Sequence, residues 1–394
     1  MIEICKKEEC IGCGACLSAC SHGAISMRPD GLGFLYPQID QSVCVNCGLC
    51  FKSCFNNGDV EYNTPLSTWV GHALSSDEQL TSSSGGMASA IARCFLENEG
   101  IVYGCSGIDS SCVKHIRIER SEELYQLKGS KYVQSFMGKT YKHVVQDLKS
   151  GINVLFIGTP CQIAGLKAYL KKRSYDNLYT IDFVCHGVPS QQLLNDAISG
   201  KVCNMSNLTL VNRVKDTHGH SKYTVRLLHS GKVVYNQSYP SMGYITGFLT
   251  GLYYRLNCYH CKFARSQRVS DITLGDFWDK SDLTKLPGRK NGLSMITVNS
   301  SKGESLIRLC GTNCILKEWN YDDLINRNHQ LKHPIPLHPH RELFKINYQS
   351  KGFDKALKLA LKADLRRIRK NIFLNSLQDF LLKIPLGKFL FRKK

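Results

Sequence analysis

Residues 10–20 read Cys10-Ile-Gly-Cys13-Gly-Ala-Cys16-Leu-Ser-Ala-Cys20, which is a C-x2-C-x2-C-x3-C run. Residues 44–54, Cys44-Val-Asn-Cys47-Gly-Leu-Cys50-Phe-Lys-Ser-Cys54, repeat this spacing. Three cysteines at two-residue intervals can bind three irons of one cubane, whereas the fourth lies beyond that turn and serves the opposite cluster. The spacing therefore predicts two [4Fe-4S] clusters with crossed ligands. The predicted ligand sets are Cys10, Cys13, Cys16 and Cys54 for one cluster, and Cys44, Cys47, Cys50 and Cys20 for the other.

The double run is the arrangement of a two-cluster bacterial ferredoxin, a protein that carries single electrons. The alternative is a pair of zinc sites, but zinc usually takes pairs of C-x2-C motifs rather than a four-cysteine run that occurs twice. Small residues such as Gly12, Gly14 and Gly48 would let backbone amides approach the sulfurs. Ser21 and Phe55 stand where the usual pattern has a proline after each fourth cysteine, so the local turn is less certain than the ligands.

Length and composition bound the rest of the chain. Its 394 residues far exceed such a module, so we expect at least one further domain with a sizeable core. The 19 cysteines do not indicate a secreted disulfide scaffold, because the start of the chain is no apolar signal segment and clusters need reduced thiolates. The expected compartment is the cytosol. Because no apolar run approaches the length of a membrane span, no crossing of a bilayer is expected.

The last 44 residues, 351–394, are strongly basic, with 13 Lys/Arg against 3 Asp/Glu in a chain of net charge +19. Apolar residues recur there at three- and four-residue steps, which predicts an amphipathic helix. These residues are Phe353, Leu357, Leu361, Leu365, Ile368 and Ile372. Such a helix could dock a partner enzyme, lie peripherally on an anionic membrane surface at its inner face, or pack on its own domain with the basic side solvated. Nucleic acid is not expected, because aromatic residues are not interleaved with the basic ones.

Apolar strands alternate with helical patterns downstream of the Asn63-Thr64-Pro65 linker, which predicts an α/β body with a mixed sheet. The expected strands are 69–74, 101–108, 113–118, 153–157, 179–184, 223–228 and 232–239, and the expected helices are 87–97, 139–149, 162–172, 191–199 and 244–255. The predicted domains are residues 1–62 (the head, which holds two clusters), 66–150 and 151–345 (the two parts of the body), and 346–394 (a basic helical tail).

Four further cysteines belong to the body. Cys161 directly follows one apolar strand and Cys185 ends the next, so adjacent parallel strands would bring both thiols to the carboxyl edge of the sheet, where ligands bind. The Cys258-x2-Cys261 pair supplies two more thiols, and four thiolates suit a third [4Fe-4S] cluster. From the spacing alone, a zinc pair, a redox dithiol or unconnected buried cysteines remain alternatives.

Several motifs in the body carry a resemblance to a known family. They are Thr81-Ser-Ser-Ser-Gly-Gly86, Gly129-Ser-Lys-Tyr132, Gly158-Thr-Pro-Cys-Gln162, Cys185-His186, and Cys258-x2-Cys261 followed by Ser270-Asp-Ile-Thr-Leu-Gly-Asp276. In this order they resemble the coenzyme F-420 hydrogenase/dehydrogenase beta-subunit family over residues 66–345, and a ferredoxin pair at the amino terminus is common in its bacterial members. The resemblance implies a flavin-binding body with one cubane cluster. Its implied ligands are Cys161, Cys185, Cys258 and Cys261.

The resemblance also implies a flavin site, with FAD preferred to FMN. The implied residues are Ser83, Ser84, Gly85, Gly86, Lys131 and Tyr132. The serine–glycine stretch would open a helix at Met87, where free amides and the helix dipole favour a phosphate, although an ordinary serine cap would look the same. Lys131 and Tyr132 would meet a phosphate and an isoalloxazine edge; a surface lysine and a core tyrosine are the alternatives.

Other cysteines and histidines have simpler interpretations. Cys5, Cys94, Cys105, Cys112 and Cys203 are expected to be buried apolar residues, and Cys310-x3-Cys314 has no second pair to complete a metal site. The segment 333–340 alternates histidine with proline, which favours an extended linker over a metal site. His186 could donate a proton to a reduced product, but a structural histidine is the simpler interpretation.

Together these patterns predict an iron–sulfur flavoprotein oxidoreductase. It would accept low-potential electrons, from ferredoxin or another donor, and pass them through three clusters to a flavin and on to an acceptor that the sequence does not identify. The catalytic residues are unknown at this stage. The alternative is a non-catalytic electron-transfer protein that serves a partner enzyme.

Overall fold

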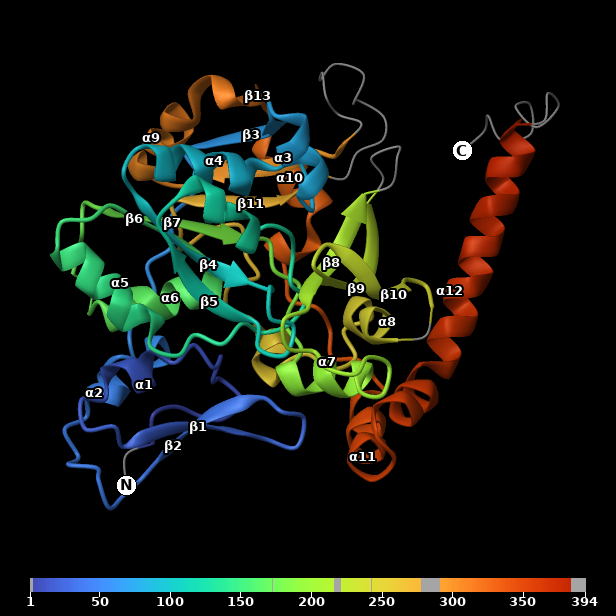
Figure 1. The fold of residues 1–394 in the computed structure, drawn as a ribbon, viewed down its shortest axis with the longest axis horizontal. Helices are drawn as coiled ribbons and strands as arrows, with labels where there is room; N and C mark the ends of the chain where they lie inside the picture. Colours follow the sequence, from blue (N-terminus) through green and yellow to red (C-terminus); the bar gives the residue numbers. More distant parts are fainter. Residues whose placement is uncertain (1–2, 172, 216–220, 242, 278–290, 384–394) are drawn as a thin grey trace.

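The computed structural model describes residues 3–171, 173–215, 221–241, 243–277 and 291–383 (Figure 1). The head contains α1 (Ala15–Ala19), β1 (Ile25–Pro29), β2 (Leu35–Ile39), α2 (Leu49–Lys52) and the 3-10 helix η1 (Phe55–Asn57). The two halves repeat one local turn, because α1 and α2 each begin after a glycine, Gly14 or Gly48, with φ of 72°. Only glycine adopts this left-handed conformation without strain. The sequence repeat is therefore also a structural repeat.

The described part of the body is built on an eight-stranded mixed sheet. In order of pairing, its strands are β13 (Cys314–Glu318), β3 (Ser67–Ala73), β12 (Ser294–Val298), β11 (Ile272–Asp276), β7 (Leu178–Phe183), β6 (Val154–Ile157), β4 (Ile101–Ser106) and β5 (Lys114–Ile118). The central strands β11, β7, β6 and β4 run parallel, and the flanking strands pair antiparallel. This confirms the predicted α/β class with a mixed sheet.

Helices cover both faces of the large sheet. Leu155 of β6 packs in a core with α4 (Met87–Glu97) and α9 (Ser301–Cys310), whereas its neighbours on β6 pack in a second core with α5 (Thr140–Lys149) and α6 (Pro160–Tyr169). Alternate residues of one strand face opposite sides of the sheet, so these two helix pairs lie on opposite faces. The second core also includes Ile11, Ala15 and Phe55 of the head. The head therefore docks on the α5–α6 face (Figure 1).

A smaller antiparallel sheet of β8 (Thr209–Lys215), β9 (Ser221–His229) and β10 (Lys232–Ser238) lies beside the large one (Figure 1). The predicted hairpin is β9–β10. The helices near it are α7 (Gln191–Ile198) and α8 (Tyr244–Leu249), followed by the 3-10 helix η3 (Leu256–His260). The prediction of a helix over 244–255 was wrong about where the helix ends. Helix α8 stops at Leu249, because Gly251 turns the chain with φ of +68°.

The remaining elements complete the described fold. They are α3 (Ser76–Thr81), η2 (Ser121–Gln126), η6 (Gly311–Asn313), α10 (Tyr321–Arg327), η7 (His329–Leu331), α11 (Arg341–Lys351) and α12 (Phe353–Lys383). Within this described part of the chain, no helix is both long and apolar enough to cross a membrane.

The first half of α12 belongs to the body rather than to a separate tail. Leu357, Leu361 and Leu365 are 0%, 0% and 5% exposed and share a core with α7, α8 and the smaller sheet. Arg366 and Arg367 on the other side are exposed. The first half thus adopts the packed alternative, whereas Figure 1 shows the later turns of α12 extending away from the body.

Candidate metal centres

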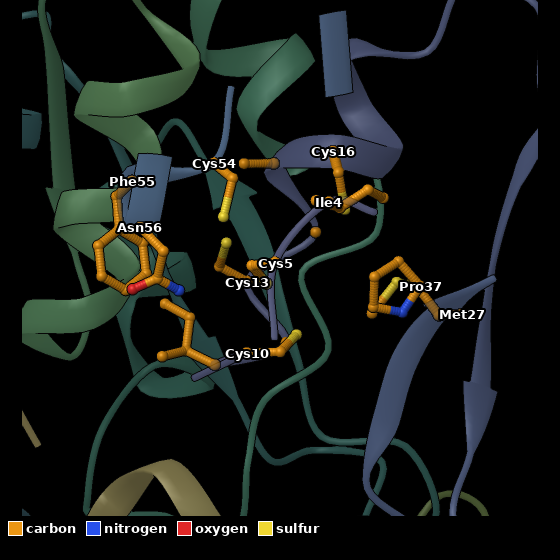
Figure 2. Close-up of a pocket in the computed structure, with 14 residues that line it drawn as sticks. Ile4, Cys5, Cys10, Cys13, Cys16, Met27, Pro37, Cys54, Phe55 and Asn56 are labelled. Atoms are coloured by element: carbon orange, nitrogen blue, oxygen red, sulfur yellow. The ribbon is translucent and has the colours of Figure 1, made fainter. Parts of the chain in front are cut away.

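Two pockets in the head are each lined by a predicted set of four cysteine ligands. The inner cluster site is formed by Cys10, Cys13, Cys16 and Cys54 (Figure 2), and the outer cluster site by Cys20, Cys44, Cys47 and Cys50. The structure therefore brings together the two crossed sets that the spacing predicts. No carboxylate lines either pocket in the described head; the remaining walls are mostly apolar. Sulfur donors with apolar surroundings fit an iron–sulfur cluster, since hard cations need oxygen ligands.

A fifth thiol, Cys5, lines the inner pocket (Figure 2). Its hydrogen bonds with the thiols of Cys10 and Cys54 raise the pKa of Cys5 and lower the pKa of Cys10 to about 6. The prediction of a buried apolar residue was wrong for Cys5, which is partly exposed and lies among candidate ligands. Its position outside the repeated spacing gave no signal for this contact.

The third site unites four cysteines from three parts of the body. Cys161 lies in the first turn of α6, Cys185 follows β7, Cys258 lies in η3 and Cys261 comes directly after it. Burial, and secondly the neighbouring thiols of the set, raise the pKa of Cys161, Cys185 and Cys258 to about 12. Burial likewise raises the pKa of Cys261.

These thiols fit a metal cluster. Four partly buried thiols at close range do not ionise readily together, because the thiolates would repel one another. Bound metal cations reverse this, since a coordinating thiol is deprotonated outright. Cys161, Cys185, Cys258 and Cys261 would hold the third cluster, as the resemblance implies.

Helix α6 connects the inner cluster site to the third site. Cys161 and Gly165 are four residues apart on this helix, which is about one turn, or about 6 Å along its axis. A Cβ added at Gly165 would lie 3.0 Å from Sγ of Cys13 and 2.9 Å from Oη of Tyr141. The proximity of Cys13 and Cys161 adds to burial in raising the pKa of Tyr141. One helical turn and one tyrosine therefore separate thiols of the two sites.

A second bridge runs from the body to the head through Arg255. Its backbone precedes η3, and its guanidinium Nε donates to the carbonyl of Cys10 at 2.6 Å. Asn257 donates to the carbonyl of Glu9 at 3.2 Å, and Gln134 donates to the carbonyl of Ile11 at 2.7 Å. These residues were not predicted, because nothing in their spacing distinguishes them from other polar residues of the body.

The implied flavin residues lie near one another but are engaged within the protein. Ser83 accepts a hydrogen bond from the amide of Ser130 at 2.7 Å, which joins the serine–glycine stretch to the segment with Lys131 and Tyr132. Ser84 donates to the carbonyl of Leu293 at 2.7 Å. Gly86 has φ of +84° and begins α4, as the sequence predicts.

The glycines of this stretch also have a structural reason. A Cβ added at Gly85 would lie 2.6 Å from the carbonyl oxygen of Gly71, and one added at Gly86 would lie 3.0 Å from the carbonyl oxygen of Glu78. Backbone therefore packs closely against this loop whether or not a phosphate binds there.

Lys131 is partly buried rather than a fully exposed surface lysine. It donates to the carbonyls of Leu127 and Lys128 at 2.7 and 2.9 Å, and burial lowers its pKa to about 8. Tyr132 stacks on Phe248 with 4.3 Å between ring centroids. Both side chains have structural contacts that would hold them in place without a cofactor.

A charged group that was not predicted surrounds Tyr132. Arg213 pairs with Asp276 at 2.6 Å, and its guanidinium lies 5.3 Å from the ring centre of Tyr223. Lys215 donates to the carbonyl of Ser84 at 2.5 Å; desolvation, and secondly Arg213, lower its pKa to about 8. Desolvation also lowers the pKa of His186, whereas Asp276 acts to raise it. Because His186 adjoins Cys185, these groups extend from the third site to the serine–glycine loop.

His338, His340 and Asp364 bring their potential ligand atoms within 4.8 Å of one another. The backbone amide of His340 donates to Nδ1 of His338 at 3.1 Å. Neutral His338 therefore carries its proton on Nε2, which lies 3.3 Å from Asp364, and has no lone pair there for a metal. The group is a hydrogen-bonded clasp between the extended segment and α12.

Of the other four cysteines that were predicted to be buried, the structure confirms Cys94 alone. Cys94 is buried, but Cys105 is only partly buried, and Cys112 and Cys203 are exposed. Cys310 forms hydrogen bonds with both Cys94 and Cys314, so three thiols from α9, α4 and β13 lie close together. The hydrogen bond from Cys310 lowers the pKa of Cys94 to about 6.

Comparison with known families supports these assignments at the level of domains. Residues 9–57 match the model of the 4Fe-4S dicluster domain. Residues 152–323 match the model for the carboxyl terminus of the beta subunit of coenzyme F420 hydrogenase/dehydrogenase. The chain is thus an iron–sulfur electron-transfer protein with two cluster sites in its head. This second match confirms the resemblance to the coenzyme F420 hydrogenase/dehydrogenase beta-subunit family over residues 152–323.

Among solved structures, a chain of the F420-reducing [NiFe] hydrogenase complex from Methanosarcina barkeri, studied by xenon derivatization, is similar to this one. The two chains are 16% identical, the match covers 75% of this chain and 91% of that chain, and the TM-score is 0.45. A comparison with curated protein sequences found no match.

Proposed function

We propose that this chain is a flavin-dependent oxidoreductase that relays low-potential electrons from the head into the body. Cys10, Cys13, Cys16 and Cys54 would hold one [4Fe-4S] cluster, Cys20, Cys44, Cys47 and Cys50 the second, and Cys161, Cys185, Cys258 and Cys261 the third. The observation that carries this proposal is the contact between Gly165 and Cys13, since it leaves about one helical turn between candidate ligands of two sites.

The order of the three sites supports electron flow from the surface of the head inward to the body. Cys47 is exposed, and the outer cluster site is flanked by the exposed apolar residues Val43, Val45 and Phe51. Small, partly apolar patches suit the weak and transient contacts of electron-transfer partners. A ferredoxin or similar low-potential donor would dock there, and the inner cluster site would pass electrons on to the third.

A flavin would occupy the region of Ser83, Ser84, Gly85, Gly86, Lys131 and Tyr132. When bound, a flavin supplies conversion between single-electron transfer and two-electron hydride chemistry. The residues of this chain would hold it: the amino end of α4 offers free amides for a phosphate, and the Lys215 ammonium lies beside the same loop.

One observation favours a second candidate, an electron-transfer protein without its own catalysis. Ser84, Lys131 and Lys215 each donate to carbonyls of the protein, so these side chains have partners without a cofactor. In that case electrons would leave the third site for a partner enzyme, and α12 would offer the exposed Arg366, Arg367 and Lys370 as a basic surface for docking.

Anaerobic purification separates these candidates. Three [4Fe-4S] clusters and one flavin predict about twelve irons and one flavin per chain, and a ferredoxin-driven reduction of the bound flavin. Twelve irons without flavin would favour the second candidate. Eight irons would defeat the third cluster, and zinc in a colourless protein would defeat the relay itself.

A further inference from the structure

We propose that Arg255 is a fixed positive charge that raises the reduction potential of a cluster in the inner site and so keeps this buried cluster able to accept electrons. The inference deepens the proposed relay and depends on it only for the presence of a cluster on Cys10, Cys13, Cys16 and Cys54. It assigns to Arg255 of the body a role in the chemistry of the head.

The placement of Arg255 points to the cluster. Its side chain is 1% exposed, although its backbone belongs to the body. Beyond the bond from Nε to the carbonyl of Cys10, Nη2 donates to the carbonyl of Leu35 at 2.9 Å and lies 3.6 Å from Sγ of Cys10. The guanidinium therefore contacts the backbone and the ligating sulfur of one residue.

The neighbours of Arg255 in the described structure include no carboxylate. Its other contacts are neutral: Oε1 of Gln134 accepts from Nη1 at 3.2 Å, and the ring centres of Tyr36 and Phe34 lie 4.3 and 5.6 Å away. A cation removed from water needs a compensating negative charge. The thiolate-bound cluster beside Cys10 would provide that charge.

Other buried arginines of this chain show what Arg255 lacks. Arg268 pairs with Asp182 at 3.0 Å, and Arg213 pairs with Asp276 at 2.6 Å. Those charges are compensated within the protein, so they exert a weaker field on their surroundings. Arg255 alone of these three directs an uncompensated charge at a cysteine thiol.

The consequence for the potential follows from charge. Reduction adds one negative charge to a cluster, and burial disfavours that charge because solvent no longer stabilises it. A cation at hydrogen-bonding distance from a ligand sulfur favours the reduced state. The outer pocket, in contrast, is lined by neither lysine nor arginine and contains the exposed Cys47. Arg255 thus offsets the burial that docking imposes on the inner cluster site.

The test is a potentiometric titration of the full chain, prepared without oxygen and followed by electron paramagnetic resonance of the head clusters. In Arg255→Gln, which keeps a hydrogen-bond donor but removes the charge, we expect the reduced-to-oxidised ratio of one head cluster at the wild-type midpoint to fall about tenfold. This equals a shift of about 59 mV to lower potential for a one-electron couple. Arg255→Lys should restore most of the difference.

Gln134 offers a second variant and a matched control. Gln134→Glu would place a carboxylate against the guanidinium while Arg255 remains, and should lower the same midpoint even if Arg255→Gln fails to assemble. Gln134→Leu removes the neutral bond to the carbonyl of Ile11 and should leave the midpoint in place. Unchanged midpoints in both Arg255→Gln and Gln134→Glu, or an equal shift in Gln134→Leu, would overturn the inference. The third-cluster assignment is tested separately by iron content, since the head titration does not depend on it.

Discussion

The inner and outer cluster sites of the head have the same ligand spacing and the same glycine-initiated turns, yet their surroundings differ. Cys10 of the inner site is buried and Cys13 packs in the core that the head shares with the body, whereas Cys47 of the outer site is exposed. The inner site also receives Arg255 from the body, and Cys13 touches helix α6. A repeated ligand motif therefore determines where clusters bind, and the docking partner determines how the two sites differ.

The largest expected effect comes from removing one ligand in each half. Cys54→Ala should remove about four irons and also loosen the head from the body, because the inner site forms part of the docked surface. Cys47→Ala should remove about four irons and leave docking intact. Iron analysis and limited proteolysis near residues 63–65 would measure both. Equal proteolytic sensitivity of the two variants would contradict the difference between the halves.

The second-largest effect is expected at the contact between Gly165 of α6 and Cys13 of the head. Gly165→Val would force a side chain against Cys13 and Tyr141, and we expect a loss of about 1–3 kcal/mol in stability with slower electron transfer from the head into the body. Anaerobic urea unfolding and stopped-flow reduction measure the two effects. Gly58→Ala is the matched control, because a Cβ at Gly58 meets nothing within 4 Å. A transfer rate unaffected by Gly165→Val would exclude this route.

Acid should lower the stability of the part of the body that packs against the inner cluster site. Burial lowers the pKa of His115 from 6.5 to about 4, and its Nδ1 meets Ser135, which accepts a hydrogen bond from Gln162 of α6. The unfolded chain takes up a proton below pH 6.5 and the folded chain does not, so stability falls as the pH drops from 6.5 towards 4, by about 1 kcal/mol per unit. Urea unfolding of wild type and His115→Gln at pH 7.5 and 5.5 checks this; the same slope in both would refute it.

The smallest expected effect concerns the outer half. Val45→Asp in the exposed apolar patch should slow reduction by a ferredoxin a few-fold, because it disrupts a weak partner contact while all ligands remain. Leu80→Asp, at another exposed apolar residue that lies in the body, is the control. Stopped-flow reduction at several salt concentrations measures the rates. Equal rates in the two variants would place the donor elsewhere.

Much of the architecture could be predicted from the sequence, because it depends on local patterns. The helix predicted over 87–97 is α4 with the same bounds, and the apolar run at 153–157 contains β6. The cysteine runs predicted the dicluster domain, since cluster ligands have fixed spacing. These features require only short stretches of chain.

Features that depend on distant contacts could not be predicted. Arg255 contacts Cys10 across 245 residues, and Lys215 contacts Ser84 across 131. Cys5 joins the inner site although it is outside the repeat. The helix predicted to reach 255 ended at Leu249, because a single left-handed glycine outweighed the apolar pattern. Tertiary packing and backbone conformation, rather than a local sequence pattern, determine each of these features.

The division of α12 has a practical consequence for anyone who shortens this protein. A truncation that begins at residue 351 would remove Leu357 and Leu361, which fill the core beside the smaller sheet, and the damaged fold would hide any effect on docking. Cutting after Leu365 instead keeps that core and still deletes nine of the 13 basic residues of 351–394. The safe boundary thus runs through the middle of a helix rather than through a loop.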